Sequence, residues 1–91
     1  MEFEWDDGKS VQNLRMRGFG FDYAACIFDG PTVEAVDDRR TYGEMRIRAI
    51  GQVDQNVLVV IYTDRHAVRR IISARKANGK ERQLWQSFVN P

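Results

Sequence analysis

The segment Val57-Leu58-Val59-Val60-Ile61 is apolar at every position and rich in β-branched residues. Such residues favour strands, and a strand without a polar side is typical of one that is covered on both faces. The segment therefore predicts the central strand of a sheet, and the rest of the fold can be built outward from it.

Short polar connections lie on both sides of this strand. Asp54–Asn56 precedes it and Asp64–Ala67 follows it, and both are hairpin-sized, whereas a parallel crossover needs about a dozen residues or more. The segments Met45–Gly51 and Val68–Lys76 are then its antiparallel neighbours, and Thr32–Val36 supplies a fourth strand.

Helical patterns lie before and after the strands. Asp7–Arg17 ends at Gly18, a common residue at a helix C-terminus, and Phe21–Phe28 has apolar residues at helical spacing. A third helix is predicted after Asn78, because Glu81 completes the spacing of a capping box. Its apolar stripe should dock on the sheet and consists of Leu84, Trp85 and Phe88.

The predicted fold class is α+β. A four-stranded antiparallel sheet packs with two N-terminal helices and one C-terminal helix, and the alternation in Glu2–Trp5 is compatible with an additional short edge strand. With 91 residues there is room for one hydrophobic core, so residues 1–91 should form a single domain.

The composition argues against several classes of protein. Cys26 is the only cysteine and His66 the only histidine, so neither an internal disulfide nor a structural zinc site is expected. No stretch approaches the roughly 20 apolar residues of a membrane span, and the N-terminus is acidic where a signal peptide would be basic. We expect a cytoplasmic protein without cofactor, metal or membrane contact.

The charges are unevenly distributed along the chain. Residues 1–38 contain nine acidic and three basic side chains, a net charge of −6, whereas residues 39–91 contain four acidic and eleven basic ones, a net charge of +7. Of the 14 basic residues 11 are arginine, which suits bidentate phosphate contacts. The C-terminal half therefore favours an anionic partner.

These arginines come from several strands and could converge on one face of the sheet around Glu44. They are Arg46, Arg48, Arg65, Arg70 and Arg75. Guanidinium groups around one carboxylate suit phosphate cleavage, because arginine stabilises charge on phosphate oxygens while a carboxylate moves protons. The alternative is structural: Arg75 could pair with Glu44, and Arg70 with Asp64, as cross-strand salt bridges.

Other reactive groups favour structural roles. Cys26 lies in an apolar stretch and is expected to be a buried thiol, and His66 is expected to be solvated in a hairpin turn. Gly18-Phe19-Gly20 follows a helix rather than a strand, so it is interpreted as a helix–helix turn and not as a phosphate loop.

One set of residues, spread over nearly the whole chain, resembles the BrnT family of type II toxins. It comprises Phe3-Glu4-Trp5-Asp6, Lys9, Asn13, Gly18, Phe21, Ala24, Phe28, Glu44, Arg46, Ile50-Gly51, Arg70-Ile71-Ile72-Ser73-Ala74-Arg75, Ala77 and Glu81-Arg82. The resemblance implies a RelE-like fold, metal-independent endoribonuclease activity that arrests translation and growth, and neutralisation by a BrnA-like ribbon-helix-helix antitoxin. Operator DNA would then be bound only indirectly, through the antitoxin.

The resemblance and the distribution of basic residues together predict the site. The catalytic residues are expected to be Glu44, as the base, with Arg46, Arg70 and Arg75, and the RNA-binding residues are expected to be Arg17, Arg48, Arg65 and Lys76.

The chain departs from the family pattern at one place. Family members commonly have Lys-His-Gly after the first helix, whereas this chain has Met16-Arg17-Gly18. Because a guanidinium does not act as a base, an alternative function is a non-catalytic RNA- or partner-binding module that has lost cleavage. A transcriptional repressor acting alone is disfavoured, since no helix has a reading face of polar and basic residues.

Overall fold

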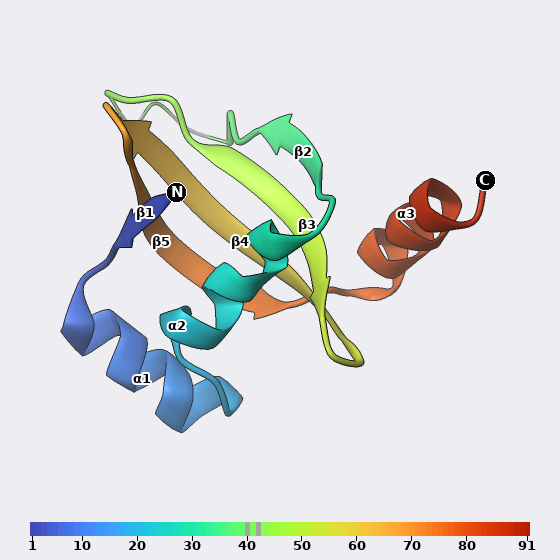
Figure 1. The fold of residues 1–91 in the computed structure, drawn as a ribbon, viewed down its shortest axis with the longest axis horizontal. Helices are drawn as coiled ribbons and strands as arrows, with labels where there is room; N and C mark the ends of the chain where they lie inside the picture. Colours follow the sequence, from blue (N-terminus) through green and yellow to red (C-terminus); the bar gives the residue numbers. More distant parts are fainter. Residues whose placement is uncertain (40, 42) are drawn as a thin grey trace.

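The computed structural model describes residues 1–39, 41 and 43–91, which form a sheet in the strand order β1-β5-β4-β3-β2 with helices around it (Figure 1). The elements, in chain order, are β1 (Glu2–Glu4), α1 (Asp7–Arg17), α2 (Phe21–Ala24), the 3₁₀ helix η1 (Ala25–Asp29), β2 (Val33–Val36), β3 (Ile47–Val53), β4 (Asn56–Arg65), β5 (Val68–Lys76) and α3 (Gly79–Val89). No helix in this part of the chain is long and apolar enough to span a membrane.

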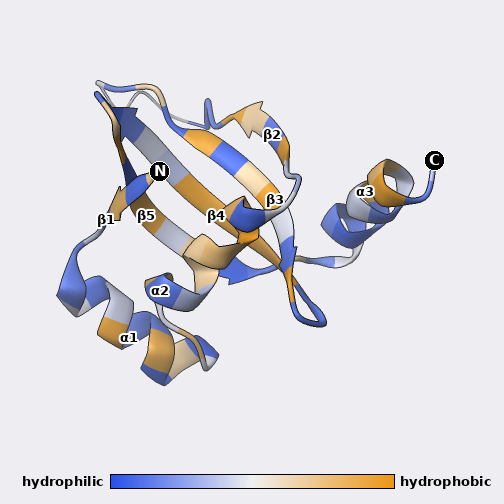
Figure 2. Ribbon diagram, in the orientation of Figure 1, coloured by the Kyte–Doolittle hydropathy of each residue, from blue (hydrophilic) through white to orange (hydrophobic). Residues whose placement is uncertain are grey.

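β4 is the central strand, as its apolar sequence predicts. Leu58 and Val60 point to one face of the sheet and join the core beneath the N-terminal helices, whereas Val59 joins a second cluster on the other face. All three are almost completely buried. Figure 2 shows that β3, in contrast, carries hydrophilic segments between its hydrophobic ones.

The sheet is mixed, so the prediction of a four-stranded antiparallel sheet is wrong in this respect. β1 is a fifth strand at the edge and runs parallel to β5, with Phe3 opposite Arg69, while the other three strand pairs are antiparallel. Hairpin-sized connections fix the direction of neighbouring strands only when these follow each other in the chain. β1 and β5 lie at opposite ends of the sequence, so no short connection constrains their direction.

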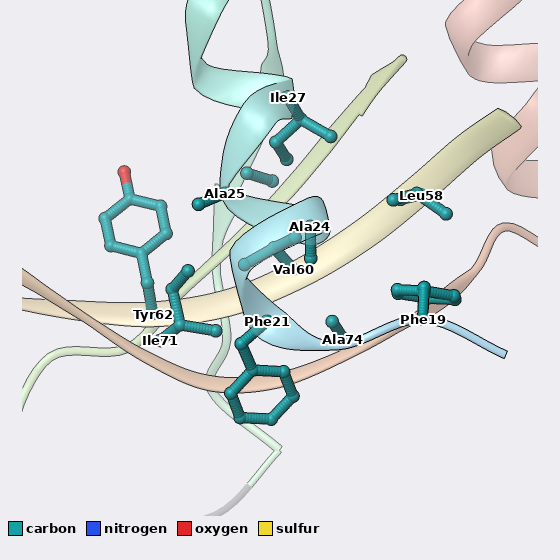
Figure 3. Packing of buried hydrophobic residues seen from close by; sticks show 11 residues of the cluster. Phe19, Phe21, Ala24, Ala25, Ile27, Leu58, Val60, Tyr62, Ile71 and Ala74 are labelled. Atoms are coloured by element: carbon teal, nitrogen blue, oxygen red, sulfur yellow. The ribbon is translucent and has the colours of Figure 1, made fainter. Parts of the chain in front are cut away.

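α2 and η1 cover one face of the sheet (Figure 3). Phe21, Ala24 and Ile27 are buried there against the central strands. The approach to β3 is close, because a Cβ atom at Gly51 would lie 2.7 Å from Cβ of Ile27. Glycine at this position therefore allows η1 to rest directly on the sheet.

The exposure of Cys26 contradicts the prediction of a buried thiol. Residues 21–28 do not form one α-helix; the 3₁₀ helix begins at Ala25, with about three residues per turn. Ala24 and Ile27, three residues apart, therefore both point to the sheet, and Cys26 between them points away.

α1 is attached to the body of the protein mainly by polar contacts. Asp6 caps its N-terminus by accepting a hydrogen bond from the Lys9 backbone N–H, and none of its residues is buried. Ser10 Oγ accepts a hydrogen bond from the Phe21 N–H at 2.8 Å, and Asn13 Nδ2 donates one to the Phe19 carbonyl at 2.9 Å. The helix is therefore largely solvated.

α3 docks on the opposite face of the sheet, through one side chain of the predicted stripe. Its capping box between Asn78 and Glu81 forms as predicted. Trp85 is buried against the Val59 cluster, but Leu84 and Phe88 are about half exposed. The prediction that all three apolar side chains dock is therefore wrong, because α3 projects beyond the end of the sheet (Figure 1).

Candidate active site

Several arginines lie on the face of the sheet that carries α3. Arg75 is opposite Val59 and Arg48 is opposite Ile61 in the strand register. Val59 and Ile61 are two residues apart on β4, so these side chains share one face, the face on which Val59 contacts Trp85. We call it the arginine face, and its members are Arg46, Arg48, Arg65, Arg70 and Arg75.

A β-bulge in β5 brings Arg70 to this face. On a regular strand, Arg70 and Arg75 would point to opposite faces, because they are five residues apart. The pairing of β5 with β4 shifts by one residue between Ser73 and Ile71, so Ile72 is an extra residue in β5. This reverses the alternation, which places Arg70 on the arginine face and Ile71 in the core.

Part of the arginine face forms a small charged cavity of about 100 Å³. Since a water molecule occupies about 30 Å³ in the liquid, this space has the scale of a few waters or one phosphate group. The side chains that define the Glu44 site are Glu44, Arg46, Arg65 and Arg70, and Asp6 and Lys9 from the start of α1 also line it.

Glu44 is held between two guanidinium groups. Arg65 Nη2 donates a hydrogen bond to Oε1 of Glu44 at 3.1 Å, and Arg46 Nε lies 3.6 Å from Oε2. Arg70 reaches the same cavity and has Nη1 at 3.8 Å from Oε1 of Glu4. The Glu44 side chain is 28% exposed, so both substrate and solvent can reach the carboxylate.

The cross-strand salt bridges considered from the sequence do not form between the predicted partners. Arg70 pairs with Glu4 and not with Asp64, whose partner is Arg69. Arg75 pairs with Glu81 and not with Glu44. These pairs depend on β1 and α3, elements whose position the local sequence of the strands does not reveal.

Two backbone contacts fix the segment that carries Glu44. Thr63, which is buried in β4, donates its hydroxyl hydrogen bond to the Met45 carbonyl at 2.7 Å. The Asp37 N–H donates to the Arg46 carbonyl at 2.8 Å. β3 begins at Ile47, two residues later than predicted. Residues 44–46 therefore lie outside the strand, and these two hydrogen bonds position them instead of strand pairing.

The geometry of the Glu44 site suits phosphate chemistry. A carboxylate can accept a proton, and guanidinium groups within the same cavity can bind phosphate oxygens and stabilise the charge that builds on them. Among residues 1–39, 41 and 43–91 there is no group of three or more His, Cys, Asp or Glu side chains that could hold a metal ion.

Arg75 lies on the arginine face but outside the Glu44 site. It is five positions from Arg70 along β5 and is not among the residues that line the Glu44 cavity. Its Nη1 and Nη2 donate to Oε1 and Oε2 of Glu81 at 2.7 and 2.8 Å. These hydrogen bonds lower the pKa of the Glu81 carboxyl against the opposing effect of burial. Arg75 thus links β5 to α3.

Arg48 lies at the same end of the arginine face, near buried Asp37 and Glu81. Its positive charge contributes to the lowered pKa of both carboxyls, although the larger cause is a hydrogen-bonded arginine in each case, Arg39 for Asp37 and Arg75 for Glu81. Arg48 is not among the residues that line the Glu44 site.

Arg17 and Lys76 do not lie on the arginine face. Lys76 is opposite Leu58, a residue of the core beneath the N-terminal helices, so its side chain points to the other face of the sheet. Arg17 is at the end of α1, and both side chains line a separate cavity there. Of the eight predicted site residues, the structure brings together Glu44, Arg46, Arg65 and Arg70.

Asp6 and Lys9 line the Glu44 site but were not predicted as site residues, although both belong to the set of residues that carries the family resemblance. The start of α1 already accounts for both residue types, because Asp6 is the N-cap and accepts a hydrogen bond from the Lys9 backbone N–H. Their position follows from the parallel pairing of Glu4 with Arg70, which brings the beginning of α1 beside β5. His66 occupies the β4–β5 turn with a positive φ of 58° and is exposed, as predicted.

Comparison with known protein families adds one finding. Residues 5–81 match a family model described as the ribonuclease toxin BrnT of type II toxin–antitoxin systems. A comparison with curated proteins found no match.

Proposed function

The chain belongs to the BrnT family of ribonuclease toxins of type II toxin–antitoxin systems, and we propose that it cleaves single-stranded RNA at the Glu44 site without a metal ion. The observation that carries this proposal is the cavity in which Glu44 lies with Arg46, Arg65 and Arg70. A carboxylate base and three phosphate-binding groups supply both functions that the reaction needs.

The reaction begins at the ribose on the 5′ side of the scissile bond. Glu44 accepts the proton of the 2′-hydroxyl while the 2′ oxygen attacks the adjacent phosphorus. Arg46 and Arg70 bind the non-bridging oxygens and stabilise their developing charge, and Arg65 holds Glu44 in position. The bond from phosphorus to the 5′ oxygen breaks, and that oxygen takes a proton from solvent. The products are a 2′,3′-cyclic phosphate and a 5′-hydroxyl end.

The position of Arg17 supports catalysis over the non-catalytic alternative. Residue 17 replaces a histidine that is common in the family, but it lines a cavity on the other face of the sheet. The replacement therefore leaves the composition of the Glu44 site unchanged. Glu44 can act as the base whatever residue occupies position 17.

The biological role we propose follows from the family. Cleavage of RNA in the cytoplasm would inhibit translation and growth, and a small ribbon-helix-helix antitoxin would neutralise the toxin by covering the arginine face. Operator DNA would be bound by the antitoxin, so the toxin would reach DNA only as part of the complex.

The test is cleavage of single-stranded RNA by the purified protein in excess EDTA, with analysis of the product ends. We expect 2′,3′-cyclic phosphate ends, and we expect Glu44→Gln to lower the rate at least about a hundredfold, since a general base contributes roughly 10² to 10⁴. Asp29→Asn, an exposed carboxylate outside the Glu44 site, is the matched control. Full activity of Glu44→Gln, or activity that returns only with added magnesium, would refute the mechanism.

A further inference from the structure

A second cavity lies at the C-terminal end of α1 and has a volume of about 470 Å³. Its wall consists of the end of α1, the turn Gly18–Gly20 and the start of α2, together with Asn56 at the start of β4 and Lys76 at the end of β5. Because Lys76 points to the helix-covered face, this cavity opens on the side of the sheet away from the arginine face. Its volume is several times that of the Glu44 site.

Two cations from different elements line this cavity. Arg17 comes from α1 and Lys76 from the end of β5, and both side chains are exposed. Neither forms an ion pair with a residue in the described part of the chain. Asp22 is the one acidic residue of the lining, so the cavity has a net positive charge and favours an anion.

The cavity is preformed by hydrogen bonds in its wall. Asn13 Nδ2 donates to the Phe19 carbonyl, which fixes the turn after α1. On the opposite wall, Tyr23 Oη donates to Oδ2 of Asp54 at 3.1 Å and accepts from Asn56 Nδ2 at 3.0 Å. These bonds join the helical layer to the β3–β4 hairpin, so little ordering is needed when a ligand enters.

The second cavity is within reach of a ligand that extends from the Glu44 site. Lys9 lines the Glu44 site and Arg17 lines the second cavity, and both belong to α1. Eight residues of helix correspond to about 12 Å along its axis. One strand of nucleic acid bound at the Glu44 site can therefore span the helix within a few nucleotides.

We propose that this second cavity binds the backbone phosphates of RNA that flanks the cleaved bond, through Arg17 and Lys76. The inference rests on the proposed ribonuclease function and adds to it a binding subsite on the other face of the sheet. Its consequence is a dependence on substrate length: an RNA that reaches both sites binds more tightly than one that fills the Glu44 site alone.

The test measures binding of labelled 2′-O-methyl RNA, which lacks the attacking hydroxyl, by fluorescence anisotropy over a series of roughly 4 to 16 nucleotides. We expect the wild type to gain affinity with length, and Arg17→Glu/Lys76→Glu to lose most of that gain, at least about tenfold, as two charge-assisted contacts disappear. The slope of log affinity against log salt should fall by about 1.4 for the longest RNA, at about 0.7 for each lost phosphate contact.

The control is Arg15→Glu/Lys80→Glu, which makes the same change in charge at exposed residues outside both sites and should retain the length dependence. The neutral pair Arg17→Gln/Lys76→Gln tests the same contacts if the charge reversal disturbs folding, which urea unfolding reveals.

The results distinguish an RNA subsite from a general charge effect and from a protein-docking site. An unchanged gain with length in the Arg17/Lys76 variants, in a wild type that cleaves RNA, overturns the second subsite alone. An equal loss in the control variant also overturns it, because the effect would then be one of net charge. If the Arg17/Lys76 variants bind RNA normally but no longer bind the antitoxin, the cavity is a protein-docking site instead. A wild type that neither binds nor cleaves RNA refutes the proposed function and the subsite with it.

Discussion

The two hydrogen bonds between Arg75 and Glu81 join the arginine face to α3, so Arg75 has a structural role whatever it does with RNA. Arg75→Ala leaves Glu81, whose side chain is 15% exposed, without its partner, and we expect the free energy of unfolding to fall by about 1–3 kcal/mol. If Arg75 also binds a phosphate next to the scissile one, Arg75→Ala lowers cleavage per folded molecule.

Glu81→Gln separates these two roles. It removes the same ion pair but retains the guanidinium on the arginine face, so we expect a similar loss of stability with cleavage retained. Urea unfolding and cleavage rates of both variants test this. Equal loss of cleavage in the two variants would mean that Arg75 acts only by holding α3.

The same ion pair should make stability depend on pH. Arg75 lowers the pKa of Glu81 in the folded protein, so the pair stabilises the fold fully above the ordinary pKa of a glutamic acid, 4.5. This contribution is lost as the pH falls from that value through the lowered pKa of the folded state. The difference in unfolding free energy between wild type and Glu81→Gln should therefore shrink on acidification, and a difference that does not change with pH would contradict this account.

Among the elements, the strands show which features a sequence can predict. β4 was predictable because continuous apolar character is a local property. The capping box at Asn78 was predictable because it involves residues three positions apart. The bulge at Ile72 was not, since a strand register depends on the partner strand. The bulge determines that Arg70, and not the adjacent Arg69, reaches the Glu44 site.

Arg69 illustrates that consequence of the bulge. It points to the helix-covered face, pairs with Asp64, and places its guanidinium 4.0 Å from the ring centroid of Tyr62 and 4.7 Å from that of Phe28. Its neighbour Arg70 lines the Glu44 site. Both residues have the same type and nearly the same local sequence, so only the sheet register distinguishes a packing arginine from a candidate catalytic one.

α3 provides a prediction about packing. Since Trp85 is 3% exposed and hydrogen-bonds Gln52 through Nε1 at 3.0 Å, Trp85→Ala should reduce the free energy of unfolding by about 3–5 kcal/mol. Leu84→Ala, at a side chain that is 52% exposed, should change it by less than about 0.5 kcal/mol. Chemical denaturation measures both, and similar losses in the two variants would show that the outer side of α3 is also packed.

At the scale of the whole molecule, the sequence shows that most of the basic residues belong to the C-terminal half. It does not show that these residues lie on two opposite faces of the sheet, as Arg75 and Lys76 do. Arg17 and Lys76 are far apart in the sequence, and their meeting at the second cavity depends on how α1 packs beside the sheet. The alternation in Glu2–Trp5 correctly indicated an edge strand, but the parallel direction of β1 is likewise a property of the assembled sheet.

The arginine face should also govern association with the antitoxin. An acidic partner segment would compete with RNA for the same guanidinium groups, which predicts fast and salt-sensitive association. We expect Arg46→Glu/Arg70→Glu to reduce copurification with a co-expressed cognate antitoxin. Arg15→Glu/Arg82→Glu, an equal charge change at exposed helix residues, should copurify normally. Normal copurification of a folded Arg46→Glu/Arg70→Glu variant would place the antitoxin elsewhere.

The most direct test of the Glu44 site is expression of the chain without its antitoxin in a bacterial host, with the integrity of bulk RNA as the measurement. The wild type should arrest growth and shorten bulk RNA, whereas Glu44→Gln at the same soluble level should leave growth normal and RNA intact. Intact RNA and normal growth with soluble wild type, or equal RNA degradation by Glu44→Gln, would contradict it.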